Sequence, residues 1–143
     1  MKKKSEDYTV IIGCGRLGAN IANTLSDSGK NVLIMDADKD AFRRLSPNYG
    51  GLSVVADGTD FEALREAELG KATSVIALTN HDNTNIMVAQ MARHLFHVKQ
   101  VIARLYDPQR ENVYKKFGID TFCPAVLSAR EIDKILSETE AAS

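Results

Sequence analysis

Short hydrophobic runs recur along this chain, and the segment after each run has the residue spacing of a helix. The first run, residues 8–12, is rich in β-branched side chains, which favour strands. After it, Leu17, Ile21 and Leu25 fall four residues apart and place one apolar stripe on a helix that ends near Gly29. Alternation of short strands with longer helices is typical of βαβ units and predicts an α/β fold.

The runs are almost wholly apolar rather than alternating between apolar and polar residues. Strands need this composition when helices cover both faces of their sheet, so the pattern predicts a doubly wound parallel sheet of six strands. We expect the strands at residues 8–12, 31–35, 52–56, 74–78, 101–105 and 120–123. We expect the further helices at residues 38–45, 61–69, 84–96, 108–117 and 128–136, the last being a C-terminal helix beyond the final strand.

The 143 residues indicate a single domain, because domains most often contain about 100 to 150 residues. Hydrophobic residues make up 44% of the chain and charged residues 26%, a division typical of a soluble globular protein. We expect a flexible N-terminal tail at residues 1–7, the folded domain at residues 8–136 and a polar tail at residues 137–143.

The charge balance and the cysteines exclude several classes of protein. Lys and Arg number 18 against 19 Asp and Glu, a net charge of −1 that argues against nucleic-acid binding by bulk charge. Cys14 and Cys123 lack metal-ligand spacing, so we expect no metal site and a reducing, cytoplasmic compartment. No apolar stretch approaches the roughly 18 residues that span a bilayer, and Lys2, Lys3 and Lys4 fit a solvated chain end better than a membrane contact.

The motif GCGRLG follows the first strand directly and opens a helix. A GxGxxG string alone is weak evidence, but this context is the one that phosphate binding requires. Gly13 permits the tight turn, Gly15 lets a pyrophosphate approach the backbone, and Gly18 allows close packing of helix and strand. The helix N-terminus adds unpaired N–H groups and a positive dipole. We therefore expect nucleotide phosphates on the six residues of this loop: Gly13, Cys14, Gly15, Arg16, Leu17 and Gly18.

Asp36, at the end of the second strand, is the acidic residue expected about 20 positions after the glycine loop. Its carboxylate can accept hydrogen bonds from both hydroxyls of a ribose, and the neighbouring Ala37 belongs to the same predicted site. A plain glycine turn with a surface aspartate is the alternative. A carboxylate at this place repels a 2′-phosphate, and only Lys39 follows it closely, so NADP is disfavoured and NAD, ATP, ADP and AMP remain.

Two arginines are further candidates for phosphate contacts. Arg16 lies inside the glycine loop, where its guanidinium can make a bidentate contact with phosphate, or it is simply a solvated first-turn residue. Arg104 lies in the apolar run VIARLY, where burial without an anionic partner would be costly. It either meets a phosphate or pairs with Asp107 or another carboxylate at the strand edge.

Polar residues follow the third and fourth strands, at the sheet edge where open α/β sheets bind ligands. Asp57 or Thr59 can hydrogen-bond an adenine edge, whereas Asp60 has the place of an N-cap. The fourth strand offers Thr79, Asn80 and Asn85, although ordinary turn chemistry would select the same residues. The predicted cofactor-binding set from these two loops is Asp57, Gly58, Thr79 and Asn80. The three histidines, His81, His94 and His97, form no spaced ligand set and are interpreted as structural or solvated.

The glycine loop with its internal arginine, Asp36, the string ADGTD, the helix with Asn85 and the strand VIARLYDP together resemble the N-terminal nucleotide-binding domain of the TrkA family. This family, also called KTN or RCK-N, comprises cytosolic regulators of potassium channels and transporters. The resemblance extends from Tyr8 to about Leu136. It implies a Rossmann fold, dimers and rings of dimers beneath a membrane pore, and a response to NAD(H) or adenine nucleotides.

Carried over to this sequence, the resemblance implies that the loop glycines and Arg16 hold phosphate, Asp36 holds ribose, Asp57 lies near adenine and Arg104 reaches toward the phosphates. It also implies that the last helix joins subunits and that the partner is a membrane potassium channel or transporter, which would hold this chain at the inner face of the cell membrane. The chain departs from many relatives because it stops after that helix, where they continue into a second ligand-binding domain.

An NAD-dependent oxidoreductase domain is the alternative function. Such an enzyme needs a substrate pocket with a positioned acid or base, yet nearly all of this chain belongs to the nucleotide-binding unit and no motif places a proton donor. A regulator needs only different ligand affinities in two conformations. The sequence therefore favours a regulator without catalytic residues over an enzyme.

Overall fold

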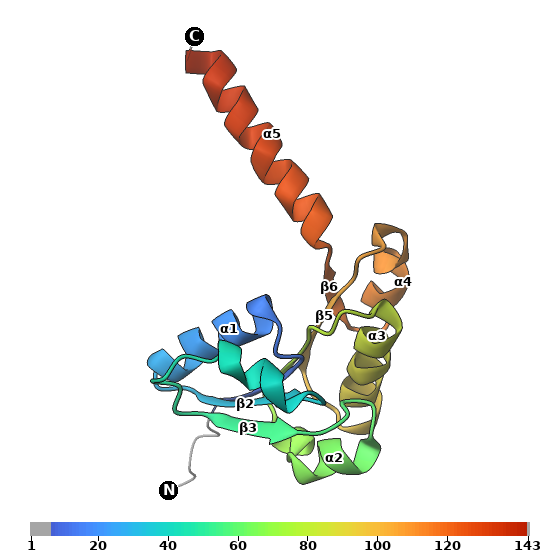
Figure 1. The fold of residues 1–143 in the computed structure, drawn as a ribbon. Coiled ribbons are helices and arrows are strands. Elements are labelled where there is room, and N and C mark those ends of the chain that lie inside the picture. The colour runs from blue at the N-terminus through green and yellow to red at the C-terminus, as the bar shows by residue number, and fades with distance from the viewer. Residues whose placement is uncertain (1–6, 143) are drawn as a thin grey trace, which may run out of the picture.

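The structure, a computed structural model, describes residues 7–142 as a parallel sheet with helices on both faces and one long projecting helix (Figure 1). The strand order is β3-β2-β1-β4-β5-β6, and all five neighbouring pairs are parallel. The strands are β1 (Tyr8–Ile12), β2 (Asn31–Asp36), β3 (Leu52–Val55), β4 (Ser74–Ala77), β5 (Gln100–Arg104) and β6 (Asp120–Phe122). The prediction of a Rossmann-like, six-stranded, doubly wound sheet is confirmed.

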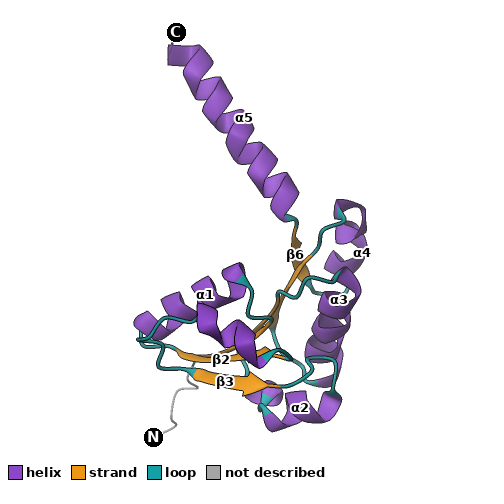
Figure 2. Cartoon of the chain, in the orientation of Figure 1, coloured by secondary structure: helices purple, strands orange, loops and turns teal. Residues whose placement is uncertain are grey.

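The α-helices are α1 (Arg16–Asp27), α2 (Phe61–Glu66), α3 (Asp82–Gln90), α4 (Glu111–Lys115) and α5 (Pro124–Ala142) (Figure 2). Three short 3₁₀ segments, η1 (Lys39–Arg44), η2 (Leu69–Lys71) and η4 (Pro108–Arg110), and one π-helical segment, η3 (Met91–Leu95), complete the helical elements. Helix α1 ends at Asp27, and the predicted stop, Gly29, lies two residues beyond, with a left-handed φ of +73° and an N–H that donates to the carbonyl of Ser26.

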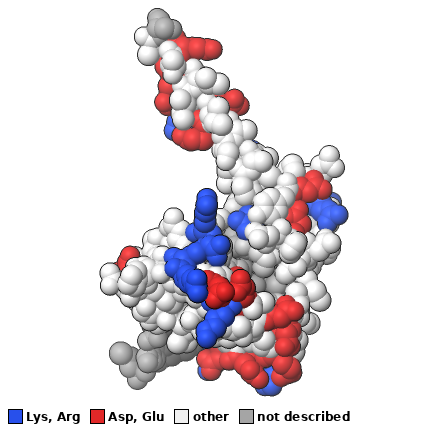
Figure 3. Space-filling view, viewed as in Figure 1, with Lys and Arg blue, Asp and Glu red and all other residues white. Residues whose placement is uncertain are grey.

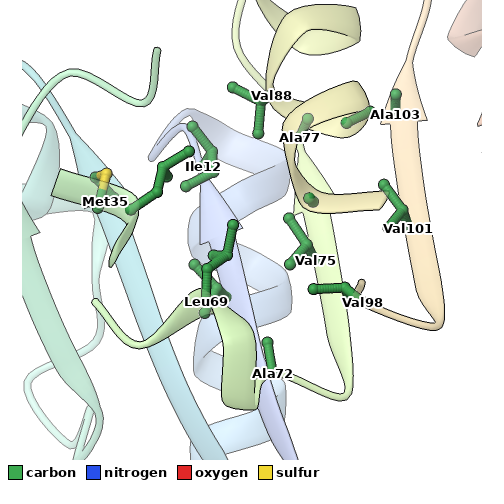
Figure 4. Close-up of a cluster of buried hydrophobic side chains, with 14 of the residues drawn as sticks. Ile12, Met35, Leu69, Ala72, Val75, Ala77, Val88, Val98, Val101 and Ala103 are labelled. Atoms are coloured by element: carbon green, nitrogen blue, oxygen red, sulfur yellow. The ribbon is translucent and has the colours of Figure 1, made fainter. Parts of the chain in front are cut away.

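Alternate residues of the central strands β1, β2 and β4 enter two different cores, one on each face of the sheet. Ile11 and Ile34 belong to the core beneath α1 and η1, together with Ala22. Their neighbours on the same strands face the other way, into a larger core that includes Leu64 of α2 and Val88 of α3. Figure 4 shows this second core, on the face of the sheet that α2 and α3 cover. The strand residues that point into it include Ile12, Met35, Val75, Ala77, Val101 and Ala103. Burial of both faces explains why the middle residues of the central strands β1, β2 and β4 are apolar without alternation.

Several helices differ from the sequence prediction. Residues 38–45 form the 3₁₀ segment η1 instead of an α-helix, and residues 108–117 divide into η4 and α4. The helix expected at residues 84–96 begins earlier, at Asp82, and its last turn is π-helical.

The helix expected at residues 128–136 is longer in the structure, because α5 begins at Pro124 and continues as a helix through residues 137–142 of the expected polar tail. Ala and Glu are frequent there and are strong helix formers, which outweighs the polarity that suggested a tail. The flexible tail expected at residues 1–7 falls outside the described residues except for Asp7. That residue is exposed, with a carboxylate oxygen 3.4 Å from Nζ of Lys30.

Helix α5 points away from the sheet in Figure 1, and none of its residues is buried. Ile132, Ile135 and Leu136 are more than half exposed along one side of it. An apolar stripe of this kind either packs back on the sheet or is buried against another subunit, and in this structure it does not pack on the sheet. Among the helices in the described range, none is long and apolar enough to cross a membrane.

Candidate functional site

A pocket of about 460 Å³ lies at the carboxyl ends of β1, β2, β3 and β4. The strand order reverses here, since the chain runs outward from β1 to β3 and then returns to place β4 on the other side of β1. Open α/β sheets bind their ligands at this switch point. Nine predicted site residues line the pocket: Gly13, Cys14, Gly15, Asp36, Ala37, Asp57, Gly58, Thr79 and Asn80. The other four, Arg16, Leu17, Gly18 and Arg104, do not line it.

The glycine loop has the backbone geometry that the motif predicts. Gly13 has a φ of +110°, and a Cβ there would lie 2.7 Å from the carbonyl oxygen of Leu78. A Cβ on Gly18 would collide with the carbonyl oxygen of Gly13, so this glycine lets α1 pack against the loop. Gly15 has open space around it and is the N-cap of α1, with no side chain capping the first turn. The N-terminus of α1 is thus accessible to an anion.

The carboxylate of Asp36 holds the glycine loop in place. Oδ2 accepts a hydrogen bond from the backbone N–H of Cys14 at 2.8 Å, and Oδ1 accepts one from the N–H of Asp38 at 2.8 Å. Each oxygen keeps a further lone pair for a ligand hydroxyl. Burial and the nearby Asp36 raise the pKa of the Cys14 thiol, so it stays neutral and adds no negative charge where phosphate would bind.

Arg44 is a pocket residue that the sequence analysis missed. It comes from η1, and its Nη1 donates to the carbonyl of Cys14 at 3.4 Å. It therefore places a positive charge in the same pocket as Asp36, and this charge can offset the repulsion between the Asp36 carboxylate and a 2′-phosphate. Figure 3 shows basic side chains gathered over the region of α1 and η1, with acidic side chains beside them. The only signal for Arg44 in the sequence is its place on the segment that follows Asp36.

Arg16 is the first residue of α1, is exposed, and forms no hydrogen bond or ion pair with any residue between 7 and 142. Its contact with phosphate stays a prediction. Leu17 is half-buried and packs on the core beneath α1 instead of facing the pocket. His81, interpreted as structural or solvated, lies in the pocket wall. The remaining lining residues that the sequence analysis did not select are Ile12, Met35, Asp38, Ala41, Ala56, Leu78 and Thr84.

Arg104 supports the end of β4. Its Nη2 donates to the carbonyls of Leu78 at 2.7 Å and Thr79 at 3.0 Å, and its guanidinium lies 5.3 Å from the ring centroid of Tyr106. The expected alternative of an ion pair with Asp107 is wrong, since Asp107 instead lies near Arg110. Nε of Arg104 is buried without a hydrogen-bond partner in the described residues. A direct contact of Arg104 with phosphate stays a prediction.

Asn85 of α3 ties the ends of two strands together and is fully buried. Its Oδ1 accepts hydrogen bonds from the backbone N–H and the hydroxyl of Thr79, at 2.7 and 2.6 Å. Its Nδ2 donates to the carbonyls of Thr79 and Arg104, at 3.1 and 2.9 Å. All of its hydrogen-bonding capacity is thus used within the protein, and Asn85 positions a pocket residue rather than binding a ligand itself.

The loop after β3 forms another wall of the pocket. Asp57 accepts hydrogen bonds from the N–H and the hydroxyl of Thr59, and these bonds lower the pKa of its exposed carboxyl. A Cβ on Gly58 would collide with Ile12, so this loop lies close against β1. Asp60 is the N-cap of α2 as predicted, accepting from the N–H of Glu62 at 3.0 Å. Within residues 7–142, no three His, Cys, Asp or Glu side chains gather as metal ligands would.

Residues 9–124 match the sequence profile of the TrkA-N domain. This chain belongs to the TrkA-N family. Among its relatives is the Trk system potassium uptake protein TrkA of Streptomyces coelicolor, 43% identical over 114 residues that cover 80% of this chain and 51% of that protein. The Trk system potassium uptake protein TrkA homolog of Methanothermobacter thermautotrophicus is 29% identical over 136 residues, covering 94% of this chain and 62% of that protein. The TrkA-N chain therefore spans about half to three-fifths of the length of these two relatives.

A solved structure titled as GsuK bound to ADP resembles this TrkA-N chain with a TM-score of 0.78 and 26% identity, covering 94% of this chain and 35% of that one. The two structures therefore share their fold over nearly the whole of this chain.

Proposed function

We propose that this TrkA-N chain is the nucleotide-binding regulatory part of a potassium channel or transporter and has no catalytic role. An adenine nucleotide, either NAD(H) or one of ATP, ADP and AMP, binds in the switch-point pocket. It then changes the arrangement of subunits that meet through α5, and the attached membrane pore responds. The chain acts in the cytoplasm, held at the inner face of the membrane by that partner.

The pocket is the observation that carries this proposal. Its walls offer the N-terminus of α1 for phosphate, the Asp36 carboxylate for ribose hydroxyls, and the loop at Asp57 and Gly58 for adenine. The Streptomyces relative is named for potassium uptake, which supports a role in potassium transport. The similar GsuK structure is bound to ADP, which supports the binding of an adenine nucleotide.

Calorimetry with ATP, ADP, AMP, NAD and NADH in parallel tests nucleotide binding. We expect saturable binding of at least one of them at one site per chain. Absence of heat for all five would overturn the nucleotide site. A turnover assay with NAD(H) and a panel of redox substrates tests the regulatory class, because any sustained turnover would favour the oxidoreductase alternative.

Arg16→Ala tests whether this arginine meets phosphate. We expect it to weaken ATP or ADP binding more than adenosine binding, since only the nucleotides carry the charge that the guanidinium would contact. The loss should be about 1.5–3 kcal/mol, the range for a hydrogen bond to a charged group. Arg43→Ala is a suitable control because Arg43 is also an exposed arginine but does not line the pocket. Equal losses for adenosine and ATP would assign Arg16 a packing role.

Ile132→Asp tests the role of α5 in assembly. The stripe of Ile132, Ile135 and Leu136 is exposed in the single chain, so we expect a dimer that buries it, and a charge at its centre should dissociate that dimer. Light scattering at micromolar concentration measures the assembly. Lys134→Asp places the same acidic residue on the opposite side of the helix and should leave the assembly unchanged. A monomeric parent would exclude the dimer, and an unaffected Ile132→Asp would move the contact elsewhere.

Ion flux through a co-reconstituted potassium transporter tests the regulatory step. We expect the flux to depend on this protein and to change when nucleotide is added. Flux that is indifferent to both would remove the regulatory proposal while leaving the nucleotide site intact.

A further inference from the structure

A second pocket, of about 580 Å³, lies at the opposite edge of the sheet, where the chain enters β5 and β6. Four of its six lining residues are basic or imidazole side chains, and none is a carboxylate. The lining residues are Arg93, His94, His97, Lys116, Phe117 and Gly118. We call this hollow the basic pocket. It shares no residue with the switch-point pocket, so it is not part of the nucleotide site described above.

Two unusual backbone turns bring these side chains together. The last turn before β5 is the π-helical segment η3, a rare conformation that occurs frequently at functional sites. Two residues after its end stands His97, whose φ of +57° is left-handed and uncommon for a residue other than glycine. The end of α4 turns at Gly118, with a φ of +77°. The ring centroids of His94 and Phe117 lie 6.1 Å apart, so the ends of the two helices are neighbours.

The guanidinium of Arg93 is fixed at the wall of the basic pocket. Its Nη1 donates to the carbonyls of Val98 at 3.1 Å and Lys99 at 3.2 Å. Its Nε and Nη2 face Gly118, since a Cβ at that glycine would lie 2.8 and 3.1 Å from them. Within residues 7–142 these two nitrogens have no hydrogen-bond acceptor. Arg93 therefore places a held guanidinium, packed against Gly118, in the wall of the basic pocket as a fixed positive charge.

Basic residues near helix C-termini have an ordinary explanation, because they offset the negative end of the helix dipole. That explanation does not account for the missing carboxylates. Five other basic residues of the described chain, Lys30, Arg43, Arg65, Lys71 and Arg110, lie within ion-pair distance of an acidic side chain. No ion pair within residues 7–142 involves a basic-pocket side chain, which is also true of eight other Lys and Arg residues there. The basic pocket differs from these scattered residues because it gathers four basic or imidazole side chains in one hollow with no carboxylate in its lining. The basic pocket is thus a local excess of positive charge without an internal counter-ion.

We propose that the basic pocket binds a phosphate-bearing anion. Arg93 supplies a fixed positive charge, Lys116 supplies a second charge from the end of α4, and the imidazoles of His94 and His97 supply N–H donors. The phosphate is either free or carried by a lipid headgroup, and both sources present the same oxygens to these side chains. The site lies across the sheet from the nucleotide pocket and is occupied independently of it.

An NMR titration of the full chain with inorganic phosphate, at constant pH and ionic strength, tests this proposal. We expect saturable shifts of the backbone amides of residues 93–99 and 116–118. Phosphate bound on the glycine loop is recognised separately, because it shifts the amides of residues 13–18 at the other edge. Absence of saturable shifts around the basic pocket at millimolar phosphate would overturn the proposal.

Variants that keep the fold make the test sharper. Lys116 is exposed, so Lys116→Gln leaves the fold intact, and His97→Asn uses a residue that tolerates the left-handed conformation. We expect the double variant to weaken phosphate binding about tenfold, as the loss of a charged contact predicts. Lys115→Gln removes the same charge from α4 but does not line the basic pocket, so it should have no effect. Equal weakening by Lys115→Gln would mean charge screening only and would also overturn the site.

Vesicles distinguish the two sources of phosphate. The protein is sedimented with phosphatidylcholine vesicles that contain or lack phosphatidic acid. Binding that requires phosphatidic acid and is lost in the double variant supports a headgroup phosphate. Phosphate shifts at the basic pocket without vesicle binding support a free phosphate.

Discussion

Replacing Asn85 with alanine should lower the free energy of unfolding by about 3 kcal/mol or more, because each buried polar group left without a partner costs about 1–3 kcal/mol. The side chain is fully buried and makes four hydrogen bonds, three with Thr79 and one with the carbonyl of Arg104. Alanine leaves the N–H of Thr79 and the carbonyl of Arg104 facing a cavity. Urea denaturation, read from the shift of the midpoint, measures the loss.

Asn83→Ala is the matched control for this variant. Asn83 lies on the same helix but is exposed, and its Oδ1 accepts a hydrogen bond from Nη1 of Arg110 at 3.3 Å. We expect a change within about 0.5 kcal/mol, as for other surface substitutions. Since Thr79 lines the nucleotide pocket, Asn85→Ala should also weaken nucleotide binding under conditions where it stays folded. Unchanged stability of Asn85→Ala would contradict the strand-tying role that its hydrogen bonds imply.

The strands could be predicted because burial on both faces leaves a strong mark on the sequence. Every strand residue from Val10 to Ile12 enters one core or the other, so the run has no polar position and stands out from its surroundings. Helices covered on one side leave a weaker mark. η1 is a 3₁₀ segment whose N-cap, Asp38, accepts a hydrogen bond from the N–H of Asp40. The spacing of apolar residues does not distinguish such a segment from an α-helix. The sequence prediction ends α5 too early, because the polarity of residues 137–142 hides the high helix propensity of their Ala and Glu residues.

The site was predicted where a motif ties a residue to a backbone position. Gly13, Gly15 and Asp36 occupy the places that the strand, loop and helix order assigns them. Arg44 could not be found in this way, and Asn85 was a candidate whose strand-tying role the sequence does not show, because both roles depend on which distant segments pack together. Asn85 bonds to the carbonyl of a residue 19 positions away, and that pairing exists only once α3 covers β4 and β5.

Replacing Asp36 with alanine should weaken nucleotide binding by about 2–4 kcal/mol, because two hydrogen bonds to a charged group are lost and such losses are not fully additive. This is roughly a 30- to 700-fold increase in Kd, measured by calorimetry. The structure adds a second reason for a loss, since the same carboxylate holds the N–H groups of Cys14 and Asp38. Asp40→Ala is the control. Asp40 lies on η1, four residues after Asp36, is exposed and does not line the pocket. Unchanged binding by Asp36→Ala would exclude the ribose site.

A ligand lacking one hydroxyl separates the two roles of Asp36. If its carboxylate accepts a hydrogen bond from the ribose, the parent should bind 2′-deoxy-ADP more weakly than ADP, by about 1.5–3 kcal/mol. Asp36→Ala has no acceptor to lose, so it should bind the two ligands equally. A variant that still distinguishes them would mean that Asp36 acts only by holding the glycine loop. In that case the affinity lost in Asp36→Ala comes from a misplaced N-terminus of α1, and the ribose is bound by another group in the pocket.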